Sequence, residues 1–255
     1  MSRESGVVVW RGKSRLGDGG NIVVIVTGLA RQSLNSKTGR SAQVWILRSD
    51  RDPLAASRTG KDSAICGDCP HKGTPRPKGD NQGLALGRAC YVTLHQAPLA
   101  IWRTWKRGGY RRVTLREASK LLRGRYVRLG AYGDPGAVPL RVISALVRQA
   151  GTWTGYTHAW RNRKSLQNYC MASVDSDAER IVAQSQGWRT FRVRASEEAL
   201  APNEITCPAS AEAGYRVTCS QCKLCRGNAL PGVKSIAIVA HGNGAGNVKR
   251  ATISV

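Results

Sequence analysis

The chain has 255 residues, 41% of them hydrophobic, so it is long enough and apolar enough to bury a sizeable core. Its 40 Lys and Arg residues against 16 Asp and Glu residues give a formal net charge of +24. Such a charge is self-repelling unless a polyanion offsets it, which favours nucleic acid as the partner and disfavours an enzyme restricted to small neutral metabolites. Neither an apolar run of about 18 residues nor a signal-peptide pattern is present, so we expect a cytoplasmic protein.

The first third of the chain predicts short strands followed by a long loop. Apolar, β-branched runs occupy residues 7–10, 21–29 and 42–49, and residues 33–40 predict a hairpin turn. Residues 51–90 are rich in Gly, Pro and Lys, and a loop this long needs a staple or a function. We therefore expect one structural domain with three parts: a β-rich segment at 1–50, a metal-binding loop at 51–100 and a βα-repeat core at 101–255.

From residue 112 onward, predicted helices alternate with predicted strands. The helices are expected at 114–124, 138–150, 163–169 and 176–187, and the strands at 126–135, 152–160, 170–175, 188–195 and 235–242. This alternation is typical of βα units and a mostly parallel sheet. A closed eight-stranded barrel takes ~250 residues, and the cysteine-rich loops use part of this chain. We therefore predict an α/β fold with a partial or irregular (β/α) barrel.

Polar and aromatic residues crowd the ends of the predicted parallel strands. They are Tyr132, Asp134, Tyr156, His158, Asp175, Arg192 and Arg194. Because the carboxyl ends of parallel strands meet at one edge, these residues predict a ligand site there. An aspartate at such a position is also a good helix N-cap. If the protein is an enzyme, we expect the substrate to be surrounded by Asp134, Tyr156, His158 and Asp175.

The last four cysteines predict a closed metal site. Cys207, Cys219, Cys222 and Cys225 have gaps of 11, 2 and 2 residues, which let four thiolates bind one zinc ion or one [4Fe–4S] cluster. Without a secretion signal, a disulfide framework is the weaker interpretation. The cysteine spacing fits zinc and a [4Fe–4S] cluster equally well.

The first three cysteines predict a second metal site. Cys66, Cys69 and Cys90 have gaps of 2 and 20 residues, and the intervening segment can loop out because closure costs grow slowly with length. Three thiolates could hold a cluster with one open iron, or zinc with His71 as the fourth ligand. Cys207 could instead complete this first site.

A basic segment at residues 103–128 contains ten Lys and Arg residues and one acid, Glu117, with Trp and Tyr interleaved. Cations bind phosphates by releasing counterions, and aromatic rings stack on exposed bases. The residues expected to contact nucleic acid are Arg103, Trp105, Lys106, Arg107, Arg111, Arg112, Arg161, Arg163 and Lys164. No base-reading motif is present, so we expect little sequence preference, and DNA or RNA remains open.

Several short motifs together resemble a family of uncharacterised, cysteine-rich bacteriophage proteins with a radical-SAM-like partial barrel. They are N-x-K-T-G at 35–39, C-x-x-C…C-Y at 66–91, GDP at 133–135, YTHAW at 156–160 and CPAS…CSQCKLC at 207–225. The resemblance implies S-adenosylmethionine as a cofactor, with Gly133 and Asp134 at its amino group. However, the chain lacks the tight C-x3-C-x2-C loop of radical-SAM enzymes, which argues against that cofactor.

The leading hypothesis is thus a phage-type iron–sulfur or zinc protein that binds nucleic acid and could be a radical-SAM-like enzyme. One alternative is a non-catalytic nucleic-acid-binding protein stapled by zinc. Another is a metal-dependent nuclease or phage replication enzyme, in which Asp134, His158 and Asp175 hold a divalent cation.

Overall fold

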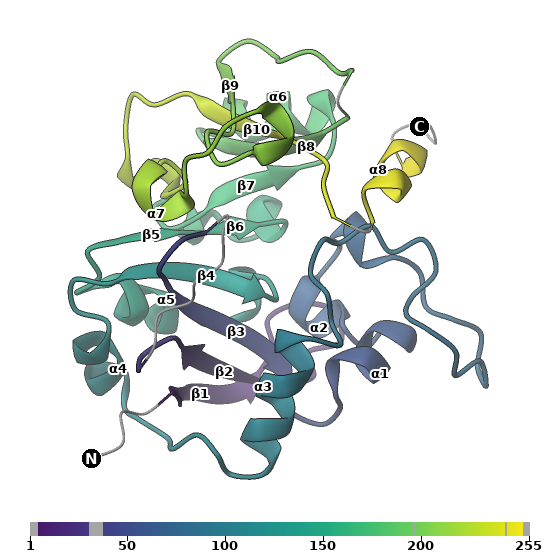
Figure 1. The fold of residues 1–255 in the computed structure, drawn as a ribbon, viewed down its shortest axis with the longest axis vertical. Coiled ribbons are helices and arrows are strands. Elements are labelled where there is room, and N and C mark those ends of the chain that lie inside the picture. The colour runs from purple at the N-terminus through teal and green to yellow at the C-terminus, as the bar shows by residue number, and fades with distance from the viewer. Residues whose placement is uncertain (1–4, 31–37, 196, 243, 252–255) are drawn as a thin grey trace.

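The computed structural model describes residues 5–30, 38–195, 197–242 and 244–251. Its fold is mixed α/β with two five-stranded sheets, in the orders β1-β2-β3-β4-β5 and β6-β7-β8-β10-β9 (Figure 1). Only Gly155 separates β5 from β6 along the chain. The predicted α/β class is therefore confirmed, whereas a barrel is not, because the strands are divided between two sheets. The hairpin turn predicted at 33–40 lies mostly outside the described residues.

The first sheet begins with an antiparallel meander built from the apolar runs of the N-terminal third. Its strands are β1 (Gly6–Lys13), β2 (Asn21–Thr27), β3 (Ala42–Arg48), β4 (Tyr126–Tyr132) and β5 (Thr152–Thr154). The pairs β1–β2 and β2–β3 are antiparallel, and β3–β4 and β4–β5 are parallel. Residues 22–26 of β2 and 44–47 of β3 are buried on both faces, and these stretches are continuously apolar rather than alternating.

Each neighbouring pair of strands in the second sheet is parallel. The strands are β6 (Tyr156–Thr157), β7 (Met171–Val174), β8 (Thr190–Arg194), β9 (Glu204–Thr206) and β10 (Ser235–Val239). Parallel neighbours need a crossover, and α6 (Asp177–Ser185) supplies the one between β7 and β8. The mostly parallel sheet predicted from the alternating pattern is confirmed.

Side-chain caps begin α4 (Leu115–Leu121) and α6 of the βα region but not α5 (Leu140–Val147). Thr114 Oγ1 accepts the Glu117 N–H at the start of α4, and α5 follows Pro139. The helix predicted at 163–169 is wrong. The segment between β6 and β7 forms only 3₁₀ turns, at Ala159–Arg161 and Lys164–Leu166.

The long loop predicted at 51–90 contains short helices. The Asp52 carboxylate accepts two backbone N–H groups at the start of α1 (Pro53–Arg58), and α2 (Ser63–Cys66) ends at the first cysteine. A 3₁₀ turn at Pro70–Lys72 follows the second cysteine. The first part of the predicted loop, residues 53–66, is therefore largely helical rather than unstructured. Further elements that we did not predict are α3 (Ala97–Lys106), α7 (Cys219–Cys222) and α8 (Ala245–Ala251).

Two apolar clusters of unequal size hold the fold together. The larger one contains the buried Val, Ile and Leu residues of β1 to β4 and α5, together with Ala118 of α4 and with Ala172, Val174 and Ala183 from the second-sheet region. The smaller one consists of Met171, Cys207, Ala209, Cys225, Ile236 and Ile238. No helix among the described residues is long and apolar enough to cross a membrane.

Candidate functional site

A pocket of about 220 Å³ lies at the carboxyl ends of strands from both sheets. Its lining includes Asp134 after β4, His158 after β6, Asp175 after β7 and His241 after β10. A single water or ion needs an order of magnitude less space, so the pocket is large enough for an organic ligand. Tyr132, Asp134, Tyr156, His158 and Asp175 thus line one cavity, as their positions at one edge of parallel strands led us to expect. Arg192 and Arg194 do not line it, because alternate residues of β8 face opposite sides and Phe191 and Val193 face the pocket instead.

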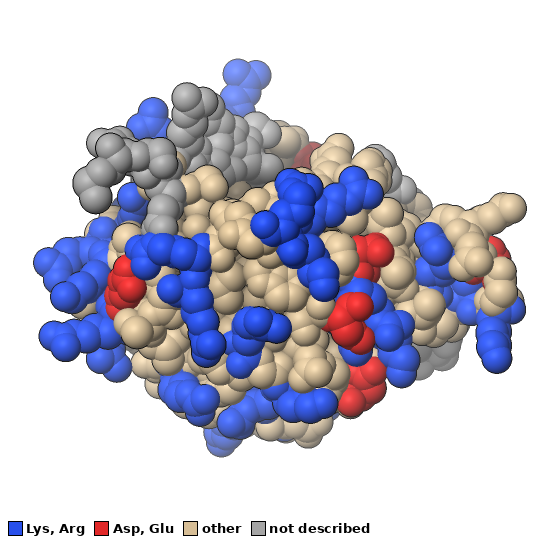
Figure 2. Space-filling model, turned by 90° about the horizontal axis from the view of Figure 1, so that it is seen from below, with Lys and Arg blue, Asp and Glu red and all other residues tan. Residues whose placement is uncertain are grey.

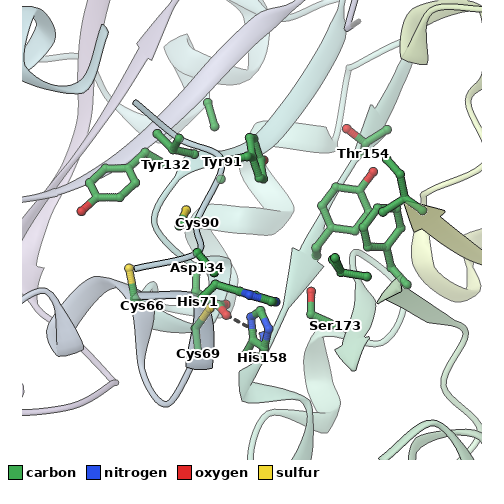
Figure 3. A pocket seen from close by; sticks show the side chains of 18 of the residues that line it. Cys66, Cys69, His71, Cys90, Tyr91, Tyr132, Asp134, Thr154, His158 and Ser173 are labelled. Carbon is green, nitrogen blue, oxygen red and sulfur yellow. Dashed lines mark hydrogen bonds between the residues drawn. The ribbon is translucent and has the colours of Figure 1, made fainter. Parts of the chain in front are cut away.

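The first cysteine group lines this pocket. Cys66, Cys69 and Cys90 lie around one side of it, beside Asp134 and His158 (Figure 3). Burial raises the pKa of the Cys66 thiol, and the nearby Asp62, Cys69 and Cys90 raise it further. Burial also raises the pKa of Cys90. Thiols in such surroundings stay protonated unless a cation compensates their charge, as a bound metal does.

Asp175 joins two histidines beside these cysteines. Its Oδ1 lies 2.7 Å from His71 Nε2, and its Oδ2 lies 3.2 Å from His158 Nε2. Burial raises the pKa of Asp175, but the interactions with the two imidazoles outweigh it and leave the pKa well below its usual range. Three ligand atoms of these residues lie within 4.8 Å of one another, a spacing at which they could hold a metal ion.

Asp134 occupies a structural position as well as a pocket position. Its Oδ1 accepts hydrogen bonds from Gly136 N and Thr157 Oγ1, at 2.6 Å each, and its Oδ2 accepts one from His158 N at 2.7 Å. Burial raises the pKa of this carboxyl, and these bonds partly offset the effect. Asp134 therefore links the end of β4 to the end of β6, and its carboxylate is already occupied by protein donors.

Gly133 precedes this aspartate in a conformation that only glycine adopts readily. Its φ is +87°, and a Cβ there would lie 2.5 Å from the carbonyl oxygen of Ile46. The Gly133–Asp134 pair that the resemblance associates with S-adenosylmethionine thus also meets local needs of the backbone.

The second cysteine group lies on the other sheet. Cys207 and Cys225 are buried in the smaller apolar cluster, with Cys219 packed against it, and Cys207 and Cys219 also line the pocket. Burial raises the pKa of Cys225, and the other three thiols act in the same direction. Cys66 packs instead against the larger cluster. The structure therefore groups Cys207 with the C-terminal cysteines.

The spacing of the thiols bears on which metal they suit. Four thiolates around one zinc at about 2.3 Å lie about 3.8 Å from one another. Among the described residues, the group of ligand atoms that all lie within 4.8 Å of each other is the His71, His158 and Asp175 set, and it contains no cysteine. In a [4Fe–4S] cluster each thiolate binds a different iron, so the sulfurs stand farther apart. In the described residues, neither cysteine group forms such a close set of ligand atoms.

Most of the predicted nucleic-acid residues are exposed, although Arg111 and Arg161 also form ion pairs with Glu117 and Glu179. Exposed side chains are those of Arg103, Lys106, Arg107, Arg111, Arg112, Arg161 and Lys164. Figure 2 shows Lys and Arg spread over one face of the molecule, with Asp and Glu in few places. Arg163 instead donates to the carbonyl oxygens of Gly136 and Val138, and Trp105 packs on the core with Arg11 and Lys106 over its ring. Arg163 thus has a structural role.

Other strand-end residues are also engaged by the protein. Arg192 is buried and forms ion pairs with Glu204 and Glu198. Tyr156 lines the pocket, with its ring centroid 4.3 Å from that of Phe191. Arg128 also lines the pocket, although we did not predict it as a site residue from the sequence. Arg128 lies an even number of positions along the chain from both Tyr126 and Tyr132. Because alternate residues of a strand share a face, this spacing could have placed Arg128 on the same face as the two tyrosines.

Comparisons of this chain with protein-family models, with curated proteins and with solved structures found no match.

Proposed function

We propose that the protein is an iron–sulfur protein that binds nucleic acid and carries out chemistry on it in the pocket between its two cysteine groups. In this proposal Cys66, Cys69 and Cys90 hold a cluster with one iron open to the pocket. The four C-terminal cysteines hold a second, closed cluster. The observation that carries the proposal is that thiols from residues 66 to 219 converge on one ligand-sized cavity.

The arrangement of the strands supports an enzyme rather than two isolated staples. Strands β3 to β5 and β6 to β10 run parallel with their neighbours, and the pocket lies at their carboxyl ends, the usual position of active sites in α/β proteins. We include in this proposal that the two sheets together form a partial barrel. It agrees with the resemblance to the radical-SAM-like bacteriophage family.

The residues of the pocket suggest a division of labour. An iron with an open position would supply electron transfer or ligand activation. His158 lies beside Cys69, and Asp175 lies 3.2 Å from His158, so this pair could hold or move a proton next to a metal held by the first cysteine group. Asp134 positions His158 through the backbone hydrogen bond described above. The net charge of +24 would draw a polyanion to the exposed basic residues.

Anaerobic purification followed by metal analysis tests the proposal. We expect brown protein that absorbs near ~400 nm and contains iron and acid-labile sulfide. Cys90→Ser should lose the iron of the first site only, whereas Cys170→Ala, which removes a buried thiol outside both groups, should lose none. Colourless protein with stoichiometric zinc would overturn the proposal and favour the non-catalytic zinc-stapled protein.

A second candidate function rests on the His71, His158 and Asp175 set. Its three ligand atoms could hold a divalent cation, as a metal-dependent nuclease or replication enzyme requires. Asp134 is not in this set, contrary to the prediction that it would share a cation with His158 and Asp175. Cleavage of DNA or RNA that needs Mn²⁺ or Mg²⁺ and is lost in Asp175→Asn, in protein free of iron, would favour this function.

A further inference from the structure

Arg128 places a cation in the middle of the pocket wall. It lies on β4, opposite Gln43 of β3 and Thr154 of β5, so the three residues share a row across the first sheet. Its side chain lines both the main pocket and a neighbouring cavity. A charged residue in the centre of a parallel sheet is unusual, because such strands are normally apolar on both faces.

The positive charge of Arg128 has no carboxylate partner in the described part of the chain. Nη2 donates to Tyr91 Oη at 2.6 Å, and a phenol hydroxyl is neutral at physiological pH. The pocket acids cannot serve, since Asp134 accepts three protein hydrogen bonds and Asp175 pairs with His71 and His158. A guanidinium stays charged, and its planar fork matches the oxygens of a phosphate or carboxylate.

Aromatic rings flank this cation in two pairs. Tyr156 and Phe191 have ring centroids 4.3 Å apart, and Tyr91 and His241 stack at 5.4 Å with an interplanar angle of 30°. All four residues line the pocket. Figure 3 shows Tyr91 above the cysteines, with Thr154 and Ser173 across the cavity. In many nucleotide-binding sites, aromatic rings stack on the base while a nearby guanidinium binds the phosphate.

We propose that this pocket binds a single nucleotide, with its phosphate on Arg128 and its base against the aromatic side chains. The inference deepens the proposed function and rests on it, because it names the ligand of the same site. The nucleotide is either free or one unit of a single strand turned into the pocket. In the second case, the exposed basic residues would hold the neighbouring phosphates.

Equilibrium binding to the full-length, iron-reconstituted protein tests the proposal. The probes are the four ribonucleoside 5′-monophosphates, the matching nucleosides, single-stranded RNA and DNA trinucleotides, and S-adenosylmethionine. We expect at least one monophosphate to bind ~10-fold or more tightly than its nucleoside, because charge-assisted hydrogen bonds to the phosphate are lost in the nucleoside. Tighter binding of a trinucleotide identifies a unit of a strand, and tighter binding of the monophosphate identifies a free nucleotide.

Matched variants test whether Arg128 causes the tighter binding of the monophosphate. Arg128→Gln should abolish the preference for the phosphate, and Arg128→Lys should keep only part of it. Arg148→Gln, at an exposed position on the α5 side of the molecule, should keep all of it. Should Arg128→Gln fail to fold, Tyr91→Ala and Tyr91→Phe form a second pair, because Tyr91 is 47% exposed. The alanine variant should weaken binding, and the phenylalanine variant should keep base stacking.

Two results would overturn the proposal. One is that no nucleotide binds folded protein, or that binding is the same in Arg128→Gln. The other is that only S-adenosylmethionine binds and depends on Arg128, which would assign the guanidinium to a carboxylate of that molecule. Iron content and visible absorption of the same samples report the proposed clusters separately. Nucleotide binding without iron would therefore refute the clusters alone, and iron without nucleotide binding would refute this inference alone.

Discussion

The two cysteine groups lie in regions with very different cores. The first group packs beside a large apolar cluster that spans the first sheet and α5 and also includes Ala172, Val174 and Ala183 of the second-sheet region. The second lies in a cluster of six residues, two of which are Cys207 and Cys225 themselves. Because this cluster is small, we expect a bound metal to contribute more to the stability around the second group than around the first. In the proposed function, the second group would be structural and the first would serve the chemistry of the pocket.

The largest expected effect is on the C-terminal region. Cys222→Ser should give aggregated or metal-poor protein, because removing a ligand removes metal-binding free energy that the small core cannot replace. Cys90→Ser should stay soluble, with a Tm within about 2 °C of the parent, because the larger core supports its surroundings. Expression, gel filtration and thermal melts of both variants measure the contrast. Soluble Cys222→Ser protein with full metal content would contradict it.

Nucleic-acid binding should belong to the first region, because α3 and α4, which carry the basic segment, pack on the first sheet. If about five or six phosphates are contacted, binding should fall ~10³-fold between 50 and 200 mM salt. Replacing Arg103, Arg107 and Arg112 with Ala should weaken binding to all sequences alike and reduce the salt slope by about three units. Arg111 is left intact because it pairs with Glu117 at 2.6 Å.

Fluorescence anisotropy with short DNA and RNA oligomers at several salt concentrations measures this slope. Arg148→Ala, which removes one exposed charge elsewhere, serves as the control and should change the slope by no more than one contact would. Tight binding that is indifferent to salt would show that the basic face has another purpose.

A smaller effect on stability is expected at Asp134, which connects the first sheet to the second. Asp134→Asn replaces Oδ2 by an NH₂ group, which cannot accept the hydrogen bond from His158 N. The loss should lower the stability by about 2–4 kcal/mol, or the Tm by about 5–10 °C. Asp80→Asn breaks an ion pair with Arg76 on the surface and should leave the Tm unchanged. Equal Tm values for the two variants would show that Asp134 does not join the sheets.

The smallest effect concerns Asp62, which is buried behind the first cysteine group. Burial raises its pKa from 3.8 to about 7, despite the opposing charges of Lys72 and Arg88. The folded protein therefore holds this proton while the unfolded chain releases it near pH 4. The resulting stabilisation is complete below pH 4 and is lost as the pH rises to about 7.

Thermal melts at pH 5 and pH 8 test this linkage. The Tm of the parent protein should fall by a few degrees more than that of Asp62→Asn, which carries no titrating group at this position. Parallel pH dependence of the two proteins would show that Asp62 titrates alike in both states.

Much of the architecture was predictable because it depends on local patterns. The β-branched runs at 7–10, 21–29 and 42–49 became β1, β2 and β3, since only a doubly buried strand needs such continuous apolarity. Alternating helices and strands likewise predicted the parallel pairs from β6 to β8. The helix expected at 163–169 was wrong: its apolar spacing is short, and the segment forms a 3₁₀ turn at Lys164–Leu166 instead.

The candidate site was predictable only in part. Strand-end positions placed Asp134, His158 and Asp175 at one edge, because side chains after parallel strands must meet there. The partnership of His71 with Asp175 joins residues 104 positions apart, and no local pattern specifies it. It depends on how the cysteine loop folds back over the second sheet.

By itself, the sequence determined the strand-forming runs, the spacing of the two cysteine groups and the excess of positive charge. These properties follow from residue type and near neighbours. Tertiary structure alone decided that β10 inserts between β8 and β9, that both cysteine groups line one pocket, and that Arg128 lies between Gln43 and Thr154. The physical reason is that strand order and register depend on which distant surfaces bury each other best, and hydrophobic burial is non-directional.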